Sequence, residues 1–362
     1  DIVTLAGAPS ELLLYLFGAS PAACASFVDG RPHLLRELRP GTLYLPHATS
    51  LRMGRLGYQS DAQSSLAVLC NDLETYGATL QRGLTQVYPP YAKIGIREPG
   101  AKGDGPDSYR QLSTTLLQIE NEFYGKIRPK RPIRQGERPL HALRERGVEY
   151  VEVRLMDLDP HAVIGITAPV MRFLDVFLLH CLLSESPPDT VDEVACVARN
   201  QECVAARGRG PSLRIGCGPQ DIGLYEWGEQ LLVECADVAE AVDAALGGQL
   251  YREAHAAQLA VMRDPARTPS ARMLADMHDH GDSYRDFVLE QSRRHRDALM
   301  ALPFPTAEEE RFAQLATASI AEQQAIEAAD TLPFEEYRKN YLAVERLGVY
   351  GGPAAHRTTE EK

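Results

Sequence analysis

The sequence lacks several features that would place a chain in a special class of protein. Its seven cysteines form no CxxC pair, so their spacing predicts neither a disulfide framework nor a zinc site. The longest apolar stretch, residues 173–183, includes Asp175 and His180 and is too short to span a membrane. No signal peptide is recognisable. We therefore expect a protein of the reducing cytoplasm that has no membrane partner.

The chain also lacks an excess of positive charge and the common nucleotide-binding loops. It has 38 Lys and Arg residues against 50 Asp and Glu residues, which gives a formal net charge of -12. General binding to nucleic acid is not expected, because there are no spare cations to displace counterions. No Walker A, GxGxxG or GxSxG motif occurs. A nucleotide would therefore have to be bound by another architecture.

The composition that is present belongs to a folded globular chain whose two parts differ in pattern. The 362 residues are 44% hydrophobic and 24% charged, and this length predicts roughly two domains. Residues 1–160 have the pattern of strands and short helices, with strands expected at 91–96 and 116–127 and a mobile loop at 98–107. Residues 161–345 have a helical pattern, and residues 346–362 that of a disordered tail. The predicted fold class is α+β, with a large helical portion in the C-terminal part.

Helices of the C-terminal part are predicted from apolar periodicity and end signals. The helix over 170–183 follows Thr167 as N-cap and Pro169 in its first turn. Its apolar residues nearly encircle it, so we expect deep burial. Thr306 and Glu309 have the spacing of a capping box at the start of a later helix. Besides the first, helices are expected over 229–246, 284–302 and 306–329.

Residues 147–155, GVEYVEVRL, have the alternation of a strand with one apolar and one charged face. Val151, Val153 and Leu155 would face the core, and Glu152 and Arg154 would lie side by side on the other face with Tyr150. Glu152 would then be available to a divalent cation and Arg154 to an anionic oxygen, which suits chemistry on a phosphoryl group. A solvated strand face with an ordinary ion pair is the alternative.

Two other stretches carry cations suited to anionic ligands. Residues 126–134 contain five Lys or Arg and could form a binding site for a polyphosphate. A solvated basic turn is the alternative. Arg52 could hold a carboxylate through two parallel hydrogen bonds, and a structural ion pair is the alternative. The residues expected to share one face of the strand just before the basic cluster are Gln118, Glu120, Glu122 and Tyr124.

Seven blocks of the sequence occur together in the order found in one enzyme family. They are YLFGASPAAC (15–24), YLPHATSLRMGRLGY (44–58), YAKIGI (91–96), LLQIENEFYGKIRPKR (116–131), GVEYVEVRLMDLDP (147–160), VMRFLDVFLLHCLL (170–183) and ADTLPFEEY (329–337). The combination closely resembles bacterial glutamate-cysteine ligase, or gamma-glutamylcysteine synthetase, of the proteobacterial type. The resemblance is specific because the seven matches are collinear.

The resemblance implies an ATP-dependent ligase, the first enzyme of glutathione synthesis, on a mainly antiparallel sheet of the glutamine synthetase-like type. In that family ATP phosphorylates the side-chain carboxylate of L-glutamate, and the amine of L-cysteine attacks the resulting gamma-glutamyl phosphate to give gamma-glutamylcysteine. Mg²⁺ ions hold the phosphates. Transfer between two anions needs metal and guanidinium charge where negative charge builds up.

Roles at the phosphate end of the site follow from the resemblance, position by position. Glu152 looks like the strand glutamate that ligates magnesium. Arg154 looks like the catalytic arginine that stabilises the transferring phosphoryl group. Asn121 and Arg128 stand in matching blocks and have the chemistry for contact with the nucleotide.

At the amino-acid end, the resemblance assigns three further residues. Arg52 and Tyr58 match the substrate-site arginine and tyrosine of the TSLR and LGY blocks. Tyr124 resembles a second wall of the cysteine pocket. The expected partners are the small molecules glutamate, cysteine and ATP, and the sequence leaves the oligomeric state open.

One departure from the family concerns the start of the chain. The family's chain begins well before the YLFGASP block, and that earlier part carries acidic residues that complete the metal sites. Because one glutamate cannot hold two or three magnesium ions, we expect a portion lacking the N-terminal part, with little or no activity by itself. Another ATP-dependent carboxylate-amine ligase and a non-catalytic interaction fragment are the competing interpretations.

Overall fold

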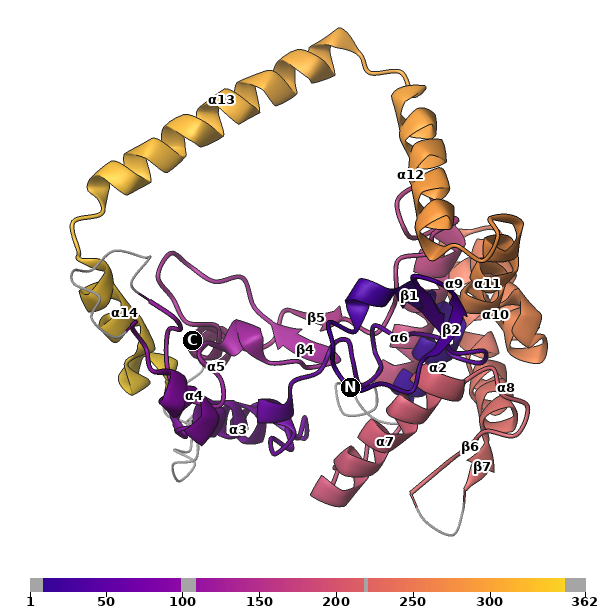
Figure 1. Cartoon of the computed structure of the whole chain (residues 1–362), viewed down its shortest axis with the longest axis horizontal. Helices are drawn as coiled ribbons and strands as arrows, with labels where there is room; N and C mark the ends of the chain where they lie inside the picture. Colours follow the sequence, from indigo (N-terminus) through magenta and orange to yellow (C-terminus); the bar gives the residue numbers. More distant parts are fainter. Residues whose placement is uncertain (1–8, 99–108, 218–220, 349–362) are drawn as a thin grey trace.

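Three small antiparallel sheets lie among the helices of the part of the chain that the computed structural model describes, residues 9–98, 109–217 and 221–348 (Figure 1). The first sheet has the order β1 (Ala22–Cys24), β3 (Thr42–Tyr44), β2 (Arg36–Arg39). β4 (Ile127–Lys130) pairs with β5 (Tyr150–Val153), and β6 (Arg214–Ile215) with β7 (Ile222–Gly223). The predicted α+β class is confirmed.

The helices are few in the first part of the chain and more numerous after residue 167. The first part contains α2 (Pro9–Phe17), α3 (Leu73–Thr85), α4 (Pro89–Ile94) and α5 (Pro139–Arg146). The later part contains α6 (Ala168–Leu183), α7 (Val191–Arg207), α8 (Leu224–Glu234), α9 (Ala236–Leu246), α10 (Leu250–Arg263), α11 (Pro269–Asp279), α12 (Tyr284–Met300), α13 (Thr306–Ala329) and α14 (Phe334–Leu342). Single turns of 3-10 helix are η1 (Ala25–Phe27), η2 (Asp61–Gln63), η4 (Glu120–Glu122), η5 (Pro265–Arg267) and η6 (Val344–Leu347). No helix in the described ranges combines the length and apolar composition needed to cross a membrane.

The main hydrophobic core joins α2 to the helices of the later part. Residues 10–17 of α2 are all buried, and their leucines share one cluster with Phe173 and Phe177 of α6, with α8 and α10, and with Leu155 just after β5. Burial of this many apolar side chains is the main source of stability for the fold. α2 is therefore central to the packing of the helical part, and the boundary expected near residue 160 stays a prediction.

α6 begins where the sequence predicts, but only one of its faces is buried. The Thr167 hydroxyl accepts a hydrogen bond from the Val170 N–H, and the helix ends at Leu183. Phe173 and Phe177 are fully buried, whereas Leu182 is 64% exposed. The expectation of deep burial all round is wrong, because an apolar circumference does not tell which faces have neighbours.

Two of the other predicted helices are found as expected, and one is divided. α12 and α13 lie over the predicted ranges, but Thr306 is already helical and Pro305 is the N-cap, so the capping box with Glu309 does not form. The helix expected over 229–246 is interrupted at Cys235 into α8 and α9, and α8 begins five residues earlier than predicted, at Leu224.

The strands predicted over 91–96 and 116–127 are wrong. Pro89 and Pro90 begin α4, which takes in most of residues 91–96, because proline is favoured in the first turn of a helix. Residues 116–127 are irregular around η4, and only Ile127 belongs to a strand. Residues 99–107 of the predicted loop lie outside the described residues.

The end of the described chain is ordered further than expected. Leu347 in η6 is 1% exposed and belongs to a second hydrophobic cluster with Leu140 and Leu143 of α5. The disorder predicted for residues 346–362 is therefore wrong at 346–347, and residues 349–362 lie outside the described residues.

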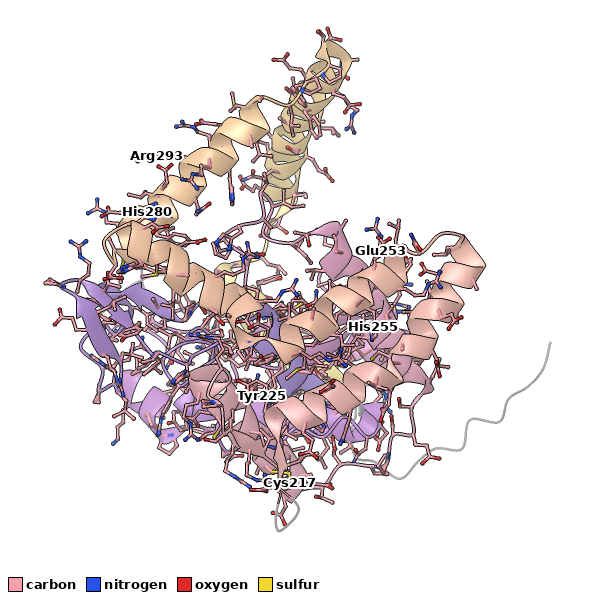
Figure 2. All side chains as sticks on the ribbon, turned by 90° about the vertical axis from the view of Figure 1, so that its right-hand side faces the viewer. Cys217, Tyr225, Glu253, His255, His280 and Arg293 are labelled. Atoms are coloured by element: carbon pink, nitrogen blue, oxygen red, sulfur yellow. A yellow bond between two sulfur atoms is a disulfide. The ribbon has the colours of Figure 1, made fainter. Side chains whose placement is uncertain are left out.

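One cysteine pair corrects the expectation drawn from spacing. Cys196 of α7 and Cys217, next to β6, form a disulfide, and Figure 2 shows Cys217 at the hairpin end of the helical layer, away from His255. The two residues are 21 positions apart, and the packing of the β6–β7 hairpin near α7 brings them together. A pairing made by tertiary contacts leaves no signature in cysteine spacing.

α13 lies apart from the rest of the molecule. It runs between α12 and α14 (Figure 1) and contains no buried residue. At its far end α14 packs on the first part of the chain, where the guanidinium of Arg138 lies over the Tyr341 ring at 4.5 Å from its centroid.

The one-sided burial of α6 predicts unequal effects of alanine substitution along one helix. Phe177→Ala should lower the free energy of unfolding by about 3–5 kcal/mol, because it leaves a cavity in the main core. Leu182→Ala on the exposed face should change it by less than about 0.5 kcal/mol. Urea unfolding followed by circular dichroism measures both, and equal losses would contradict this description of α6.

Candidate functional site

The β4–β5 pair places charged residues of both strands on one face. In its register Arg128 lies opposite Glu152. Side chains alternate along a strand, so Arg154, two positions beyond Glu152, shares that face. Val151 and Val153 pack against the main core on the other side. The alternation predicted from the sequence is confirmed.

Glu152 lies between two cations. Nη2 of Arg154 donates to Oε1 at 3.0 Å, and Nζ of Lys130 lies 3.3 Å from Oε2. Burial raises the pKa of the Glu152 carboxyl, but the hydrogen bond from Arg154 and the charge of Lys130 outweigh it and hold that pKa below its ordinary value. Oε2 is at ion-pair distance from Lys130 without hydrogen-bond geometry. Glu152 is therefore a carboxylate at neutral pH, with one oxygen bonded to Arg154 and the other in an ion pair with Lys130.

Arg154 connects this pair to two tyrosines at a polar cavity. Its Nη1 donates to Oη of Tyr58 at 2.7 Å, and Nη2 of Arg128 lies 3.4 Å from the same oxygen. The rings of Tyr58 and Tyr124 meet edge to face, with centroids 4.6 Å apart. The cavity has a volume of about 300 Å³ and is lined by these four residues and by Ser60, Gln63, Tyr91, Leu116, Asn121 and Glu122.

A buried ion pair between Glu120 and Arg138 fixes the part of the cavity wall around η4 from its interior side. Glu120 accepts from Nε and Nη2 of Arg138 at 2.9 and 2.5 Å, and both side chains are almost fully buried. A buried pair with several hydrogen bonds holds one geometry, because loss of either partner leaves an uncompensated charge. Glu120 thus points inward, whereas Tyr124 is 42% exposed. The single polar face predicted for Gln118, Glu120, Glu122 and Tyr124 is therefore wrong.

Arg128 fixes the same wall from the β4 side. Its Nη1 and Nη2 donate to the Asn121 carbonyl at 3.2 and 3.3 Å, and the residue is 5% exposed. Its Nε is buried and has no acceptor among the described residues. Two guanidinium groups, those of Arg128 and Arg154, therefore face one small cavity, which makes it suited to an anionic ligand.

Arg52 does not line this cavity. Its Nε donates to Oδ1 of Asp157 at 2.6 Å, and its Nη2 donates to the Arg154 carbonyl at 2.9 Å. Oδ2 of Asp157 accepts from the Ala19 N–H at 2.8 Å and from Oγ of Ser20 at 2.7 Å. The structural ion pair, which was the alternative for Arg52, is formed, and substrate binding by Arg52 stays a prediction.

Tyr58 is oriented by a tight turn at Gly57. The Tyr58 N–H donates to the Arg52 carbonyl, and a Cβ atom on Gly57 would lie 1.9 Å from that oxygen. Only glycine leaves room for this approach. The turn therefore couples the direction of the Tyr58 ring to the Arg52–Asp157 ion pair.

The structure brings most of the predicted site residues together and adds others. Tyr58, Tyr124, Asn121, Arg128 and Arg154 line one cavity, and Glu152 is hydrogen-bonded to Arg154. Residues that the sequence did not single out are Ser60, Gln63, Tyr91 and Leu116, whereas Glu122 was named only as a neighbour of Tyr124 on a predicted strand face. Ser60 and Gln63 follow the LGY block closely in sequence, which was the only signal that could have found them.

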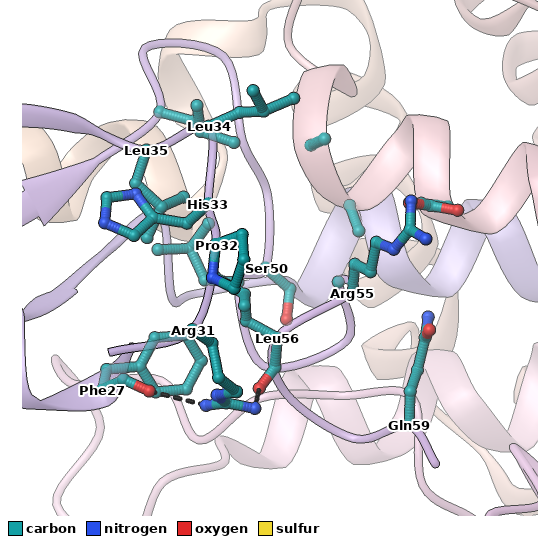
Figure 3. Close-up of a pocket in the computed structure, with 16 residues that line it drawn as sticks. Phe27, Arg31, Pro32, His33, Leu34, Leu35, Ser50, Arg55, Leu56 and Gln59 are labelled. Carbon is teal, nitrogen blue, oxygen red and sulfur yellow. Dashed lines mark hydrogen bonds between the residues drawn. The ribbon is translucent and has the colours of Figure 1, made fainter. Parts of the chain in front are cut away.

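A second, larger cavity has a different character (Figure 3). It measures about 710 Å³ and is lined largely by Phe27, Pro32 and several leucines. Arg31 at its edge is already used, since it donates to the carbonyl groups of Phe27 and Leu56 at 2.7 and 2.9 Å. None of the predicted site residues lines it. The smaller polar cavity is therefore the candidate site.

The fold of the chain is that of a solved ligase. It superposes on glutamate-cysteine ligase from Francisella tularensis, solved in complex with AMP, with a TM-score of 0.86 at 31% sequence identity, over 94% of this chain and 66% of that one. A bifunctional glutathione synthetase from Pasteurella multocida has a TM-score of 0.56 at 20% identity, over 82% of this chain and 31% of that one, a likeness of fold alone. The class defined by the structure is thus that of the glutamate-cysteine ligase fold.

Sequence comparison identifies the family. The model of the glutamate-cysteine ligase family matches residues 8–204. The chain is 46% identical to glutamate-cysteine ligase from Bordetella parapertussis over 336 residues and 46% identical to that from Azotobacter vinelandii over 334 residues. It belongs to the glutamate-cysteine ligase family. In both cases the match covers 92% of this chain and 62% of the relative's length.

The Glu152–Arg154 pair predicts a measurable change in titration. Arg154→Met should raise the pKa of the Glu152 carboxyl, because a hydrogen bond and a neighbouring positive charge are lost. NMR titration of ¹³C-labelled glutamate carboxyls measures this shift, and Arg296→Met, on the exposed face of α12, serves as the control.

The same pair predicts a pH dependence of stability with a definite sign. A carboxyl whose folded pKa lies below its unfolded value stabilises the fold above the unfolded pKa, and this contribution is lost as pH falls through the folded pKa. The loss of stability in Arg154→Met should therefore be larger at pH 7 than at pH 3. A loss independent of pH would contradict the assigned pairing.

Proposed function

We propose that the protein containing this chain joins L-glutamate to L-cysteine with ATP and gives gamma-glutamylcysteine. The observation that carries the proposal is the juxtaposition of Arg128 and Arg154 with two tyrosines at one cavity, beside Glu152, in a member of this family. In the first step an oxygen of the glutamate side-chain carboxylate attacks the terminal phosphorus of ATP, and ADP leaves. In the second step the cysteine amine attacks the acyl carbon, and phosphate and a proton are released.

The nucleotide end of the site would be formed by Asn121, Arg128 and Arg154. The AMP bound to the relative from Francisella tularensis supports a nucleotide in this fold. Arg154 would hold an oxygen of the transferring phosphoryl group, since a guanidinium is always charged and is placed here before the reaction begins. Its hydrogen bonds to Glu152 and Tyr58 keep it in place.

The residues present fit one Mg²⁺ ion rather than two or three. Oε2 of Glu152 is ion-paired with the Lys130 ammonium at 3.3 Å, a contact that a bound cation would replace, and Mg²⁺ is commonly held by one or two carboxylates together with phosphate oxygens and water. Within the described ranges no group of three His, Cys, Asp or Glu side chains could hold a metal by itself. Glu152 would therefore hold a single ion with phosphate, and the ion would offset negative charge there.

The amino-acid end of the site would be bordered by Tyr58 and Tyr124. Their edge-to-face contact forms an apolar wall beside polar groups, a setting that suits a small thiol side chain. Arg52 would act on the substrate through its neighbours, since its guanidinium is engaged by Asp157 and by the Arg154 carbonyl.

The wider setting that we propose follows from the charge and the family. The substrates are small molecules, nucleic acid is no partner because the net charge is -12, and the cytoplasm is the compartment. Another carboxylate-amine ligase would share Arg154 and Glu152 and would differ at the tyrosine wall. A non-catalytic fragment would bind no nucleotide.

Calorimetric titration of the 362-residue chain with ATP and MgCl₂ tests the nucleotide site. We expect saturable heat that is lost in Arg128→Ala, because both guanidinium groups are needed to hold adjacent phosphate oxygens. Absence of heat from the unsubstituted chain would favour the non-catalytic interpretation.

Replacing cysteine by alanine or serine in product analysis by mass spectrometry would separate this ligase from one that uses another amine.

Arg154→Ala in the protein that contains this chain should lower turnover more than substrate affinity. The reason is that its contact with the phosphoryl group strengthens as the group transfers. Steady-state kinetics with ATP, glutamate and cysteine measures both quantities, and Arg296→Ala should leave them unchanged. A rise in KM without a fall in kcat would contradict the role assigned to Arg154.

A further inference from the structure

Gln63 connects two backbone positions in the wall of the candidate site. It ends η2 and lines the polar cavity. Its Nε2 donates to the Glu122 carbonyl at 2.8 Å, and its Oε1 accepts from the Tyr124 N–H at 2.9 Å. One planar amide thus satisfies a donor and an acceptor on the two sides of Phe123, as a peptide group of a neighbouring strand would.

Tyr124 has few other restraints. Its side chain is 42% exposed, and its ring meets that of Tyr58 edge to face. The preceding residue, Phe123, has an extended backbone and packs against the second hydrophobic cluster. Phe123 therefore anchors one side of the segment, and the Gln63 amide fixes the other, which sets the direction in which Tyr124 leaves the backbone.

We propose that Gln63 is a positioning residue that aims the Tyr124 ring at the amino-acid end of the site through this two-point clamp. The proposal rests on the proposed function in one respect, namely that Tyr124 borders the pocket for cysteine. An amide suits this clamp because it carries an N–H donor and a carbonyl acceptor on one planar carbon, whereas an ionised carboxylate carries acceptors alone. A carboxylate at this position would keep the acceptor and would repel the Glu122 carbonyl.

The chain offers a matched control for the clamp. Asn71 makes the same pair of hydrogen bonds at Asp189, donating from Nδ2 to the carbonyl at 2.9 Å and accepting from the N–H at 2.8 Å. Asn71 does not line the polar cavity. Asn71→Ala therefore removes an equivalent clamp elsewhere in the fold.

Hydrogen exchange of the Tyr124 amide tests the clamp without any ligand. Exchange measured by mass spectrometry on peptides that include residue 124 should speed up about tenfold or more in Gln63→Ala, because the N–H loses its acceptor. It should stay slow in Gln63→Glu, which retains an acceptor, and should be unchanged in Asn71→Ala. Unchanged exchange in Gln63→Ala would overturn the proposal.

Binding measurements then test the positioning role. With MgCl₂, L-glutamate and a non-hydrolysable ATP analogue present, the Kd for L-cysteine should rise about fivefold to tenfold in Gln63→Ala and Gln63→Glu, while the Kd for the ATP analogue changes less than about twofold. Asn71→Ala should change neither value. Faster exchange at Tyr124 with an unchanged Kd for cysteine would also overturn the proposal.

A double variant separates positioning from direct contact. If Gln63 acts through Tyr124, then Gln63→Ala should have no further effect on cysteine binding in a Tyr124→Ala background. Additive effects would show that Gln63 touches the ligand itself, and would overturn the positioning role. Failure of the unsubstituted chain to bind cysteine would overturn the proposed function and the assignment of the pocket, while the exchange experiment would still decide whether the clamp exists.

Discussion

The carboxylate of Asp157 is the point at which three segments of the candidate site are joined. It accepts from the backbone beyond α2, from Ser20 and from Arg52, and it lies shortly after β5, in the segment that continues from Glu152 through Arg154. Its side chain is 5% exposed, so its charge is offset by Arg52 and by hydrogen bonds rather than by water. Because Arg52 also fixes the turn at Gly57, the meeting of Tyr58 with Arg154 depends on this buried carboxylate.

Much of what could be predicted from the sequence rests on local rules. The alternation in residues 147–155 indicated correctly that Glu152 and Arg154 share a face, since the period of a strand is independent of its surroundings. The N-cap at Thr167 and the extents of α12 and α13 follow from short-range signals in the same way. The resemblance to one family then supplied the roles that we propose for these residues, which alternation alone does not suggest.

The errors arose where distant residues decide the structure. Residues 116–127 have a strand-like composition, but Glu120 is drawn inward by Arg138, and the chain turns there instead of extending. The half-exposure of α6 and the Cys196–Cys217 disulfide depend in the same way on which elements pack together. Gln63 escaped notice because its two partners lie about sixty positions further along the chain, and a short polar segment gives no sign of what its side chains will meet.

The isolation of α13 has a consequence for how the chain tolerates change. With a rise of 1.5 Å per residue, its 24 residues span about 36 Å between the regions that hold α12 and α14. α13 has no buried residue whose repacking could compensate for a change in its length. An insertion or deletion of one residue would shift α14 along the axis and rotate it by about 100°, so evolution should tolerate length changes here only as near-whole turns.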